Sequence, residues 1–320
     1  MAPPGGRRKA RLVPRLLFIT SNRIGDAVLS TAALEEAMAR LPGASVVIAC
    51  GELPAPLFRA TPGLEQIVTF RKEHGRWMKL WRALAGRSYD LGVDLRGSAL
   101  TFLLPVKRRI VFAKTRRVMR KVDELAALMK APARAPKLYL DAKAREEAAR
   151  AAPPGPFLAL GAGANFIGKR WPPDRFAEIA RRLTQTGPLT GAPIVLLGGP
   201  ADRRANDEVL ACFSGVNVDL TGALDLPACA ALLERASAFI GNDSGLMHMA
   251  AAVGTPTLGL FGPSDERVYG PVGPHARALR SPVSFEELIR DKFMPLIEHS
   301  LMEDLCVDDV EAAARELLGD

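Results

Sequence analysis

The sequence has few of the residues that mark a disulfide-stabilised or metal-binding protein. Only four of its 320 residues are cysteines and four are histidines, and neither set shows a CxxC pair or metal-ligand spacing. It also contains no Asp-x-Asp motif, a carboxylate pair that commonly holds a divalent cation. We therefore expect no metal and no cofactor. The cysteines, Cys50, Cys212, Cys229 and Cys306, are predicted to be buried thiols in a reducing compartment.

The sequence has no stretch that is typical of a transmembrane helix or of a signal peptide. Residues 244 to 264 lack Asp, Glu, Lys and Arg, but Gly254, Pro256 and Gly259 interrupt them. Near the start, Pro14 and Arg15 interrupt the apolar run that follows a basic segment. We expect a cytoplasmic protein with a short basic tail before its first strand.

Charge is distributed unevenly along the chain. Residues 1–150 contain 29 Lys and Arg against 13 Asp and Glu, a net charge of +16, and residues 151–320 contain 14 against 22, a net charge of −8. The length also exceeds the size at which a single hydrophobic core usually stops growing. We therefore predict two domains, residues 1–150 and 151–320, that face different partners.

Both halves alternate short apolar runs with amphipathic stretches, the pattern of parallel α/β sheets. Strands are predicted at residues 16–19, 45–50, 66–70, 89–95 and 109–113, and at 157–163, 193–199, 217–222, 238–241 and 257–262. Residues 131–156 contain a charged helix and end in a PPGP breaker, so we interpret them as the linker. Residues 284–318 have a helical pattern and either cap the second domain or cross back to the first. The fold class is therefore α/β, with two doubly wound Rossmann-like domains that face each other across a crevice.

The strongest motif follows the predicted strand 238–241. Asn242, Asp243, Ser244 and Gly245 form a turn that opens a helix, and His248 lies four residues after Ser244 on the same face. Asp243 and Ser244 are good helix caps, so simple capping is one interpretation. The other is a phosphate site at the start of the helix. A second polar turn, FGPSD, follows the next strand and favours a ligand.

A glycine-bearing loop with two cations follows the predicted strand 157–163. Gly163 to Lys169 formally matches GxxxxGK, but Arg170 stands where a magnesium-binding Ser or Thr is needed, and WPP stops the required helix. A dinucleotide fingerprint is excluded because the third glycine is missing. We predict that Lys169 and Arg170 neutralise a diphosphate, the alternative being two surface cations.

The segment SNRIGD directly follows the first predicted strand. Gly25 is expected to form a tight turn, and Asp26 begins the next helix. Asp26 is therefore either a helix N-cap or, at the mouth of the crevice, a general base.

Residues 106–121 carry eight cations, among them Lys107, Arg108, Arg109 and Arg120. A solvated face is one interpretation, and contact with an anionic membrane surface or a phosphorylated acceptor is another. Nucleic-acid binding would usually add aromatic side chains, and only Phe112 is nearby.

The three motifs SNRIGDAVLST, GKRWPP and FIGNDSGLMHMAAAVGTPTLGLFGPSD resemble the heptosyltransferases of glycosyltransferase family 9, in the same order and over most of the chain. The resemblance implies a GT-B fold and metal-independent, inverting transfer, typically of heptose from ADP-heptose to the lipopolysaccharide core. By motif, Asp26 resembles the catalytic base and Lys169 the phosphate-contacting lysine. Asp243, Ser244, Gly245 and His248 match the donor-binding turn.

We therefore predict a glycosyltransferase in which Asp26 and Lys169 are catalytic. The predicted donor-binding residues are Gly25, Gly163, Arg170, Asn242, Asp243, Ser244, Gly245 and His248. The acceptor would be an anionic glycolipid, with Lys107, Arg108, Arg109 and Arg120 as candidate contacts and with peripheral contact at the cytoplasmic face of the inner membrane. Two alternatives stay open at this point, a sugar-nucleotide epimerase on the same fold and a nucleic-acid-binding protein that uses the basic half.

Overall fold

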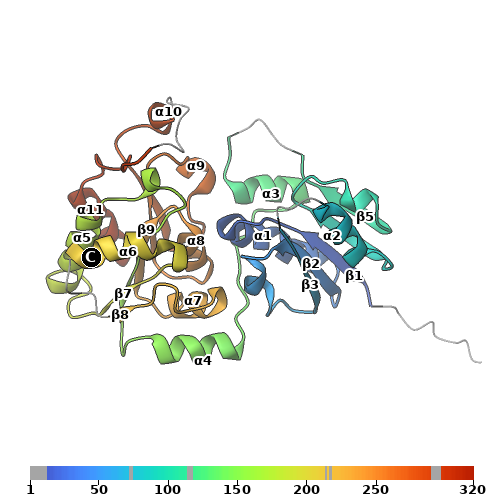
Figure 1. Ribbon diagram of the computed structural model, residues 1–320, viewed down its shortest axis with the longest axis horizontal. Helices are drawn as coiled ribbons and strands as arrows, with labels where there is room; N and C mark the ends of the chain where they lie inside the picture. The colour runs from blue at the N-terminus through green and yellow to red at the C-terminus, as the bar shows by residue number, and fades with distance from the viewer. Residues whose placement is uncertain (1–12, 72–74, 114–117, 213–214, 216–217, 290–296) are drawn as a thin grey trace, which may run out of the picture.

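The computed structural model describes residues 13–71, 75–113, 118–212, 215, 218–289 and 297–320. Two α/β domains lie side by side, each built on one all-parallel sheet (Figure 1). We call the part that holds the first sheet the first domain and the part that holds the second sheet the second domain. The predicted fold class is confirmed.

The first sheet has five strands in the order β3-β2-β1-β4-β5. Their bounds are β1 Arg15–Ile19, β2 Ser45–Gly51, β3 Leu64–Phe70, β4 Tyr89–Asp94 and β5 Val106–Val111. Helices α1 (Ile24–Arg40) and α3 (Lys121–Met129) cover one face. Helix α2 (Arg76–Leu84) and the short η2 (Leu100–Phe102) cover the other, and η1 is Ala55–Phe58.

The second sheet has six strands in the order β11-β10-β9-β6-β7-β8. Their bounds are β6 Leu158–Gly161, β7 Ile194–Leu196, β8 Val218–Asp219, β9 Ala238–Asn242, β10 Thr257–Phe261 and β11 Ala276–Arg280. Counted from its own first strand, this sheet has the 3-2-1-4-5-6 order of dinucleotide-binding folds, and the first sheet has the same order without the sixth strand.

The helices of the second half pack on both faces of the second sheet. Their bounds are α4 Ala142–Ala151, η3 Ile167–Lys169, α5 Pro173–Gln185, η4 Pro200–Asp202, α6 Arg203–Cys212, α7 Leu226–Leu233, α8 Gly245–Ala252, α9 Glu266–Tyr269, α10 Phe285–Leu288 and α11 Val307–Leu318. Helix α5 begins at Pro173, as the first-turn preference of proline predicts.

Each of the ten predicted strands has a counterpart, but β11 was missed. Its residues, ARALR, include Arg277 and Arg280 and are all only partly buried. A strand at the edge of a sheet does not need an apolar run, so the apolar pattern of the sequence does not indicate β11. The predicted strand 109–113 is also shifted, because β5 begins at Val106.

The linker helix α4 is confirmed, but it packs on the second domain. Ala144 and Ala148 are buried beside Phe157 and the α7 residues of the second sheet's core. The boundary between residues 150 and 151 stays a prediction, although the described side chains of α4 pack with the second domain.

The prediction that all four cysteines are buried is wrong for two of them. Cys50 and Cys229 are buried, and burial raises the pKa of each thiol to about 12. Cys212 and Cys306 are exposed because they lie at the end of α6 and at the start of α11, where side chains face solvent.

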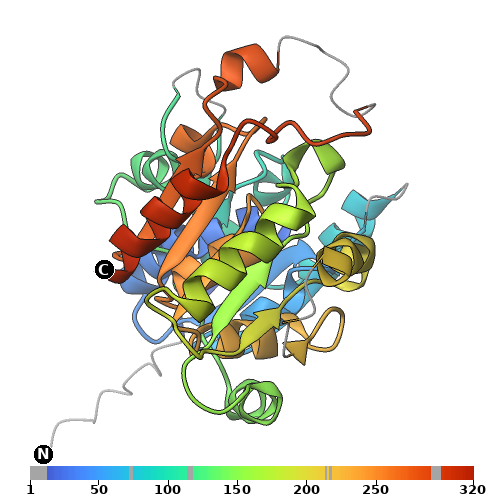
Figure 2. The same cartoon turned by 90° about the vertical axis from the view of Figure 1, so that its left-hand side faces the viewer.

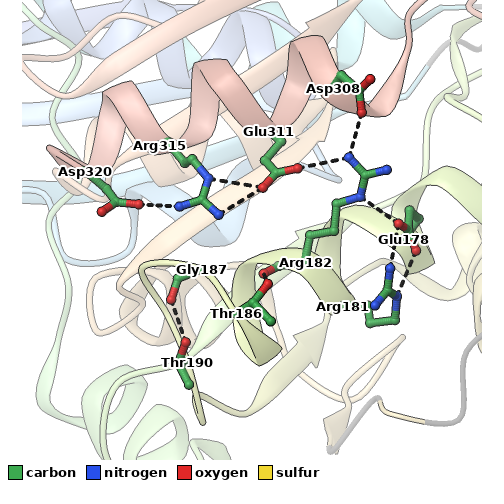
Figure 3. Close-up of polar contacts among 10 residues, drawn as sticks. All are labelled: Glu178, Arg181, Arg182, Thr186, Gly187, Thr190, Asp308, Glu311, Arg315 and Asp320. Atoms are coloured by element: carbon green, nitrogen blue, oxygen red, sulfur yellow. Dashed lines mark hydrogen bonds and ion pairs between the residues drawn. The ribbon is translucent and has the colours of Figure 1, made fainter.

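The last helix, α11, caps the second domain rather than crossing back to the first, as it lies beside α5 (Figure 2). A network of ion pairs joins the two helices (Figure 3). Arg182 of α5 contacts Glu178 at 2.6 Å, Asp308 at 2.6 Å and Glu311 at 2.9 Å. Arg181 and Arg182 lower the pKa of Glu178 to about 2.

The two domains share a buried apolar contact. Val28 of α1 and Leu57 of η1 are buried in the same cluster as the α7 and α8 side chains. Beside it, Arg59 reaches from the end of η1 to the N-caps of α4 and α7, which are Asp141 at 2.7 Å and Asp225. This ion-pair group holds the domains in one relative orientation.

Candidate functional site

Polar side chains gather at the point where strand order reverses in each sheet. In the first sheet this point lies between the carboxyl ends of β1 and β4, and in the second it lies between those of β6 and β9. Ligands of doubly wound sheets usually bind at these positions. Asp26 follows β1, Lys169 follows β6, and the NDSG turn follows β9, so the structure brings the three sequence motifs to the predicted crevice.

The start of helix α8 is not capped by a side chain. Ser244 holds the N-cap position with extended backbone angles, but its hydroxyl makes no capping hydrogen bond. That hydroxyl oxygen is buried without a hydrogen-bond partner in the part of the chain that the structure describes. The capping interpretation of the NDSG turn is therefore wrong, and the first amides of α8 remain available to an anion.

Lys169 lies over this helix start because Asp243 holds it there. Its Nζ is 2.6 Å from Asp243 Oδ2, and both side chains are largely buried, with 18% and 10% exposed. The ammonium group also lies 5.8 Å from the centroid of the Phe166 ring. Lys169 is thus a positioned cation, and the surface-cation interpretation does not describe it.

Asn242 fixes the loop that carries Lys169. It is fully buried, its Nδ2 donates to Ala162 O at 2.7 Å, and its Oδ1 accepts from Trp171 N at 3.0 Å. Both ends of the loop are therefore tied to the end of β9. We assign Asn242 a positioning role, and a direct contact with a donor stays a prediction.

The other two predicted loop residues differ in what surrounds them. A side chain at Gly163 would meet Asp202, whose Oδ1 would lie 2.2 Å from the added Cβ. Gly163 is thus needed for the close packing of the loop against η4. Arg170 is partly buried, and its backbone oxygen accepts a hydrogen bond from Ser300 Oγ at 2.6 Å.

His248 is buried between the domains, with 4% of its side chain exposed. Burial lowers its pKa, although Asp243 and Asp26 act in the opposite direction. The imidazole is therefore neutral at pH 7. Its Nε2 lies 3.9 Å from Asp243 Oδ1, and Nδ1 has no hydrogen-bond partner among the described residues.

Two glycines let the facing ends of α1 and α8 touch (Figure 1). A Cβ on Gly25 would lie 2.8 Å from His248 Cδ2, and a Cβ on Gly245 would lie 2.6 Å from Ile24 Cγ2. Gly25 is the second residue of α1 rather than a tight turn, so that prediction is wrong. Both glycines serve the contact between the domains, and contact with a donor stays a prediction for each.

Asp26 faces a polar pocket of about 280 Å³ on the first domain's side of the crevice. The N-cap of α1 is Arg23, so the interpretation of Asp26 as an N-cap is wrong. Ser21 Oγ lies 3.4 Å from Asp26 Oδ2. The pocket is lined by Thr20, Ser21, Asp26, Ser30, Leu95, Arg96, Lys121, Leu125 and Tyr269.

Sequence reasoning did not single out Arg96 and Tyr269 of this pocket, and it gave Lys121 only as one cation of the run 106–121. Arg96 follows β4 in a turn that the buried Asp94 holds by accepting from Arg96 N at 2.9 Å and Ser98 N at 3.0 Å. Tyr269 comes from α9 of the second domain. Burial raises the pKa of Tyr269, and so does the charge of Asp26. The pocket is therefore completed by residues from distant segments.

None of the four predicted acceptor contacts lines this pocket in the described part of the chain. Lys107, Arg108 and Arg109 lie on the edge strand β5, where Lys107 pairs with Asp90 at 2.7 Å. Arg120 pairs with Asp123 at 2.8 Å, directly before α3. Residues 114–117 of the basic run lie outside the described residues.

Polar atoms without partners collect at four strand ends of the second sheet. Within the described ranges, these buried atoms are Arg170 Nε after β6, Ser244 Oγ after β9, Ser264 Oγ after β10 and Ser281 Oγ after β11. An unpaired buried polar group costs about 1–3 kcal/mol. Four at one sheet edge indicate a surface that hydrogen-bonds a polar ligand.

Two other kinds of site are absent from the described residues. They contain no group of three His, Cys, Asp or Glu side chains arranged to hold a metal ion. No described helix is both long and apolar enough to cross a bilayer.

Two Rossmann-like domains that meet across a crevice, with polar strand ends on both sides, form the architecture of the GT-B fold. The sequence model of glycosyltransferase family 9 (heptosyltransferase) matches residues 101–292, more than half of the chain. The chain belongs to this family, and it is an enzyme that transfers a glycosyl group.

Individual relatives agree with this assignment. The chain is 25% identical over 314 residues to lipopolysaccharide heptosyltransferase 2 of Escherichia coli, covering 83% of this chain and 88% of that protein. It is 26% identical over 296 residues to lipopolysaccharide heptosyltransferase 1 of Pseudomonas aeruginosa, covering 81% of each.

Solved structures confirm the fold. The family 9 glycosyl transferase from Veillonella parvula superposes with a TM-score of 0.80 at 21% identity, over 95% of this chain and 97% of that one. The structure of the Escherichia coli ADP-heptose lipopolysaccharide heptosyltransferase II superposes with a TM-score of 0.77 at 23% identity, over 95% and 98%.

Proposed function

We propose that this glycosyltransferase moves heptose from ADP-heptose to a hydroxyl group of a lipopolysaccharide core acceptor, with inversion and without a metal ion. The observation that supports the site most directly is Lys169, held by Asp243 over the uncapped start of α8 and facing the domain that carries Asp26. Relatives that are named lipopolysaccharide heptosyltransferases, and the solved structure of an Escherichia coli heptosyltransferase with ADP, support the donor and acceptor classes.

The donor's diphosphate would bind at the start of α8. Amides of Gly245 and Leu246 point along the helix axis, and the helix dipole places partial positive charge there. Lys169 adds a full charge, and Arg170 adds a second cation at the end of the same loop. Asp243 would not contact a phosphate, because it is negative; its proposed role is to orient Lys169.

Asp26 would act as the general base. It takes the proton of the acceptor hydroxyl, whose oxygen forms a bond to the anomeric carbon as the bond from that carbon to the diphosphate breaks. The leaving ADP carries the released negative charge to Lys169 and the α8 amides, and a well-placed donor of this kind contributes about 3 kcal/mol. Attack from the face opposite to the leaving group inverts the anomeric configuration.

The acceptor would enter the pocket beside Asp26. Arg96 and Lys121 give this pocket two cations, which suits an anionic glycolipid better than a neutral sugar. Contact with the inner membrane, where such an acceptor is embedded, is part of the same proposal and leaves the enzyme peripheral at the cytoplasmic face.

Ligand-induced thermal stabilisation with ADP, UDP, GDP and CDP tests the donor class. A ligand at 100 times its dissociation constant adds about 2.7 kcal/mol, so selective stabilisation by ADP is the expected result. Transfer is then measured with ADP-heptose and core acceptor, against donor alone. No response to ADP, or isomerised sugar from donor alone, would overturn the proposal.

A further inference from the structure

An apolar groove of about 590 Å³ lies on the first domain, outside the catalytic crevice. Its walls come from α2 and from the segment around η2. The lining residues are Trp77, Met78, Trp81, Ser98, Ala99, Leu100 and Leu103. Large apolar side chains are seldom so concentrated on a free surface unless they meet a partner.

Helix α2 presents more apolar surface than its sheet can cover. Leu80 and Leu84 are buried against the first sheet, whereas Trp77, Met78 and Trp81 are 39%, 54% and 37% exposed. Trp81 Nε1 donates to Leu103 O at 3.1 Å, which ties the helix to the segment after η2. On that segment Phe102 and Leu103 are 65% and 67% exposed, so the apolar surface continues across both elements.

Exposed cations surround this apolar surface. Lys79 and Arg82 lie on α2, and Lys107 and Arg109 lie on β5, all four exposed. The guanidinium carbon of Arg109 lies 5.7 Å from the centroid of the Phe102 ring, which joins the two groups of residues directly. An amphipathic helix with tryptophans on one face and cations beside them is typical of attachment to an anionic bilayer.

Among the described residues, the first sheet places this surface away from the second domain. Helices α1 and α3 cover the face of the first sheet that meets the second domain, and α2 with η2 covers the opposite face. Figure 1 shows α2 and β5 on the part of the first domain away from the second domain. The segment after β4 links this face to the catalytic pocket, since Arg96 lines the pocket and Ser98 and Leu103 line the groove.

We propose that the α2 and η2 surface docks on the anionic leaflet of a lipid bilayer, with Trp77, Trp81, Phe102 and Leu103 in the interfacial layer. The surrounding cations contact the lipid phosphates. This inference extends the proposed function by naming the surface that meets the membrane. Docking there holds the segment after β4, and with it Arg96, next to the layer in which a glycolipid acceptor lies.

Vesicle binding tests the docking surface with neither donor nor acceptor, so its outcome is separate from that of the proposed reaction. The full-length protein is mixed with vesicles of phosphatidylcholine alone or of phosphatidylcholine with phosphatidylglycerol. Tryptophan emission reports insertion, because two of the three tryptophans lie on this surface and the third, Trp171, is 1% exposed. We expect binding to the anionic vesicles, a blue shift and quenching by lipids with spin labels in the upper acyl chain.

Leu103→Glu and Leu53→Glu form a matched pair. The two leucines are 67% and 63% exposed in the same domain, but Leu53 lies between β2 and η1, outside the groove. Withdrawing one leucine from the interface weakens partition about tenfold or more, so Leu103→Glu should do so and Leu53→Glu should not.

Several results would overturn the docking proposal. One is that the native chain does not bind the vesicles, and another is that it binds neutral and anionic vesicles equally. A third is that Leu103→Glu and Leu53→Glu weaken binding to the anionic vesicles equally. A dimer that dissociates in Leu103→Glu would also overturn it, because a second copy of the chain would then cover the groove.

Discussion

Asp26 and Lys169 come from different domains and have different proposed roles. Their substitutions should therefore have different effects on turnover and on ADP affinity. Asp26→Asn keeps the shape but removes the proton acceptor. We expect turnover to fall about 100-fold to 10,000-fold, with ADP affinity unchanged.

Lys169→Ala should weaken ADP binding as well as slow transfer, because it removes charge beside the diphosphate. Titration calorimetry with ADP and initial rates of transfer measure both; normal turnover in Asp26→Asn would exclude Asp26 as the base.

At Gly25, the effect of a substitution by alanine is predicted to be the opposite of what helix propensity alone would give. Replacing a helical glycine by alanine usually adds about 0.5–1 kcal/mol of stability. Here the new methyl carbon would lie 2.8 Å from His248 Cδ2, and overpacking costs about 1–3 kcal/mol. Gly25→Ala should therefore lower the stability of the folded protein and the transfer rate.

A double-mutant cycle identifies the cause of the loss in Gly25→Ala. His248→Ala removes the ring that the added methyl would meet, so the stability cost of Gly25→Ala should largely disappear in that background. Urea unfolding of the native chain, the two single variants and the double variant measures this stability cost. If the cost persists in the absence of the imidazole, the contact between α1 and α8 is not its source.

The sequence predicted candidate site residues where a motif lies in the segment after a strand, as Asp26 does after β1, Lys169 after β6 and Asp243 after β9. It did not single out Arg96 and Tyr269, which meet Lys121 only because the end of β4, the start of α3 and the end of α9 lie near one point in space. It also left two interpretations of Ser244 and Asp26. Backbone position and hydrogen bonding, which composition does not encode, excluded the capping interpretation of each, and the functional interpretations stay predictions.

At the scale of elements, α11 is held on α5 by charge as well as by apolar contact. Arg181 and Arg182 hold the pKa of the Glu178 carboxyl at about 2, below its ordinary 4.5. A depressed folded-state pKa contributes stability that is present above about 4.5 and is lost as the pH falls towards 2. Arg182 also lowers the pKa of Glu311, which lies on α11, so the pairing of α11 with α5 should weaken when these carboxyls are protonated in acid.

Arg182→Ala tests this charge network. It should lower the melting temperature at pH 7, and the difference from the native chain should shrink as the pH falls from about 4.5 to 2. Amide hydrogen exchange should rise along α11. Arg204→Ala is the control, since Arg204 pairs with Glu208 at 3.2 Å within α6 and is 84% exposed. A pH-independent difference for Arg182→Ala would contradict the role of Glu178.

Elements were predictable where local chemistry determined them. Buried parallel strands are apolar runs, so ten were found, and Pro173 marked the start of α5. The edge strand β11 carries arginines and gave no such signal. The packing of α4 on α7 depends on Ala144 and Ala148, whose small size does not indicate which domain they contact.

At the scale of the whole molecule, the crevice exists only while the two domains keep their relative orientation. Arg59 is the charged link in that contact, with 25% of its side chain exposed. Hydrogen bonds to Asp141 raise the pKa of Arg59 and lower that of Asp141, so both stay charged at pH 7. The facing ends of α1 and α8 depend on this link to keep their relative position.

Arg59→Ala should therefore loosen the contact between the domains without unfolding either one. We expect the global stability to fall by about 1–2 kcal/mol. Hydrogen exchange should increase at residues 24–27 and 245–248, and the KM for acceptor should rise while ADP affinity is kept. Arg15→Ala is the matched control, because Arg15 pairs with Glu65 at 3.0 Å inside the first domain with similar exposure. If both variants increase exchange equally at the two helix ends, Arg59 is an ordinary surface ion pair and the apolar contact of Val28 and Leu57 alone orients the domains.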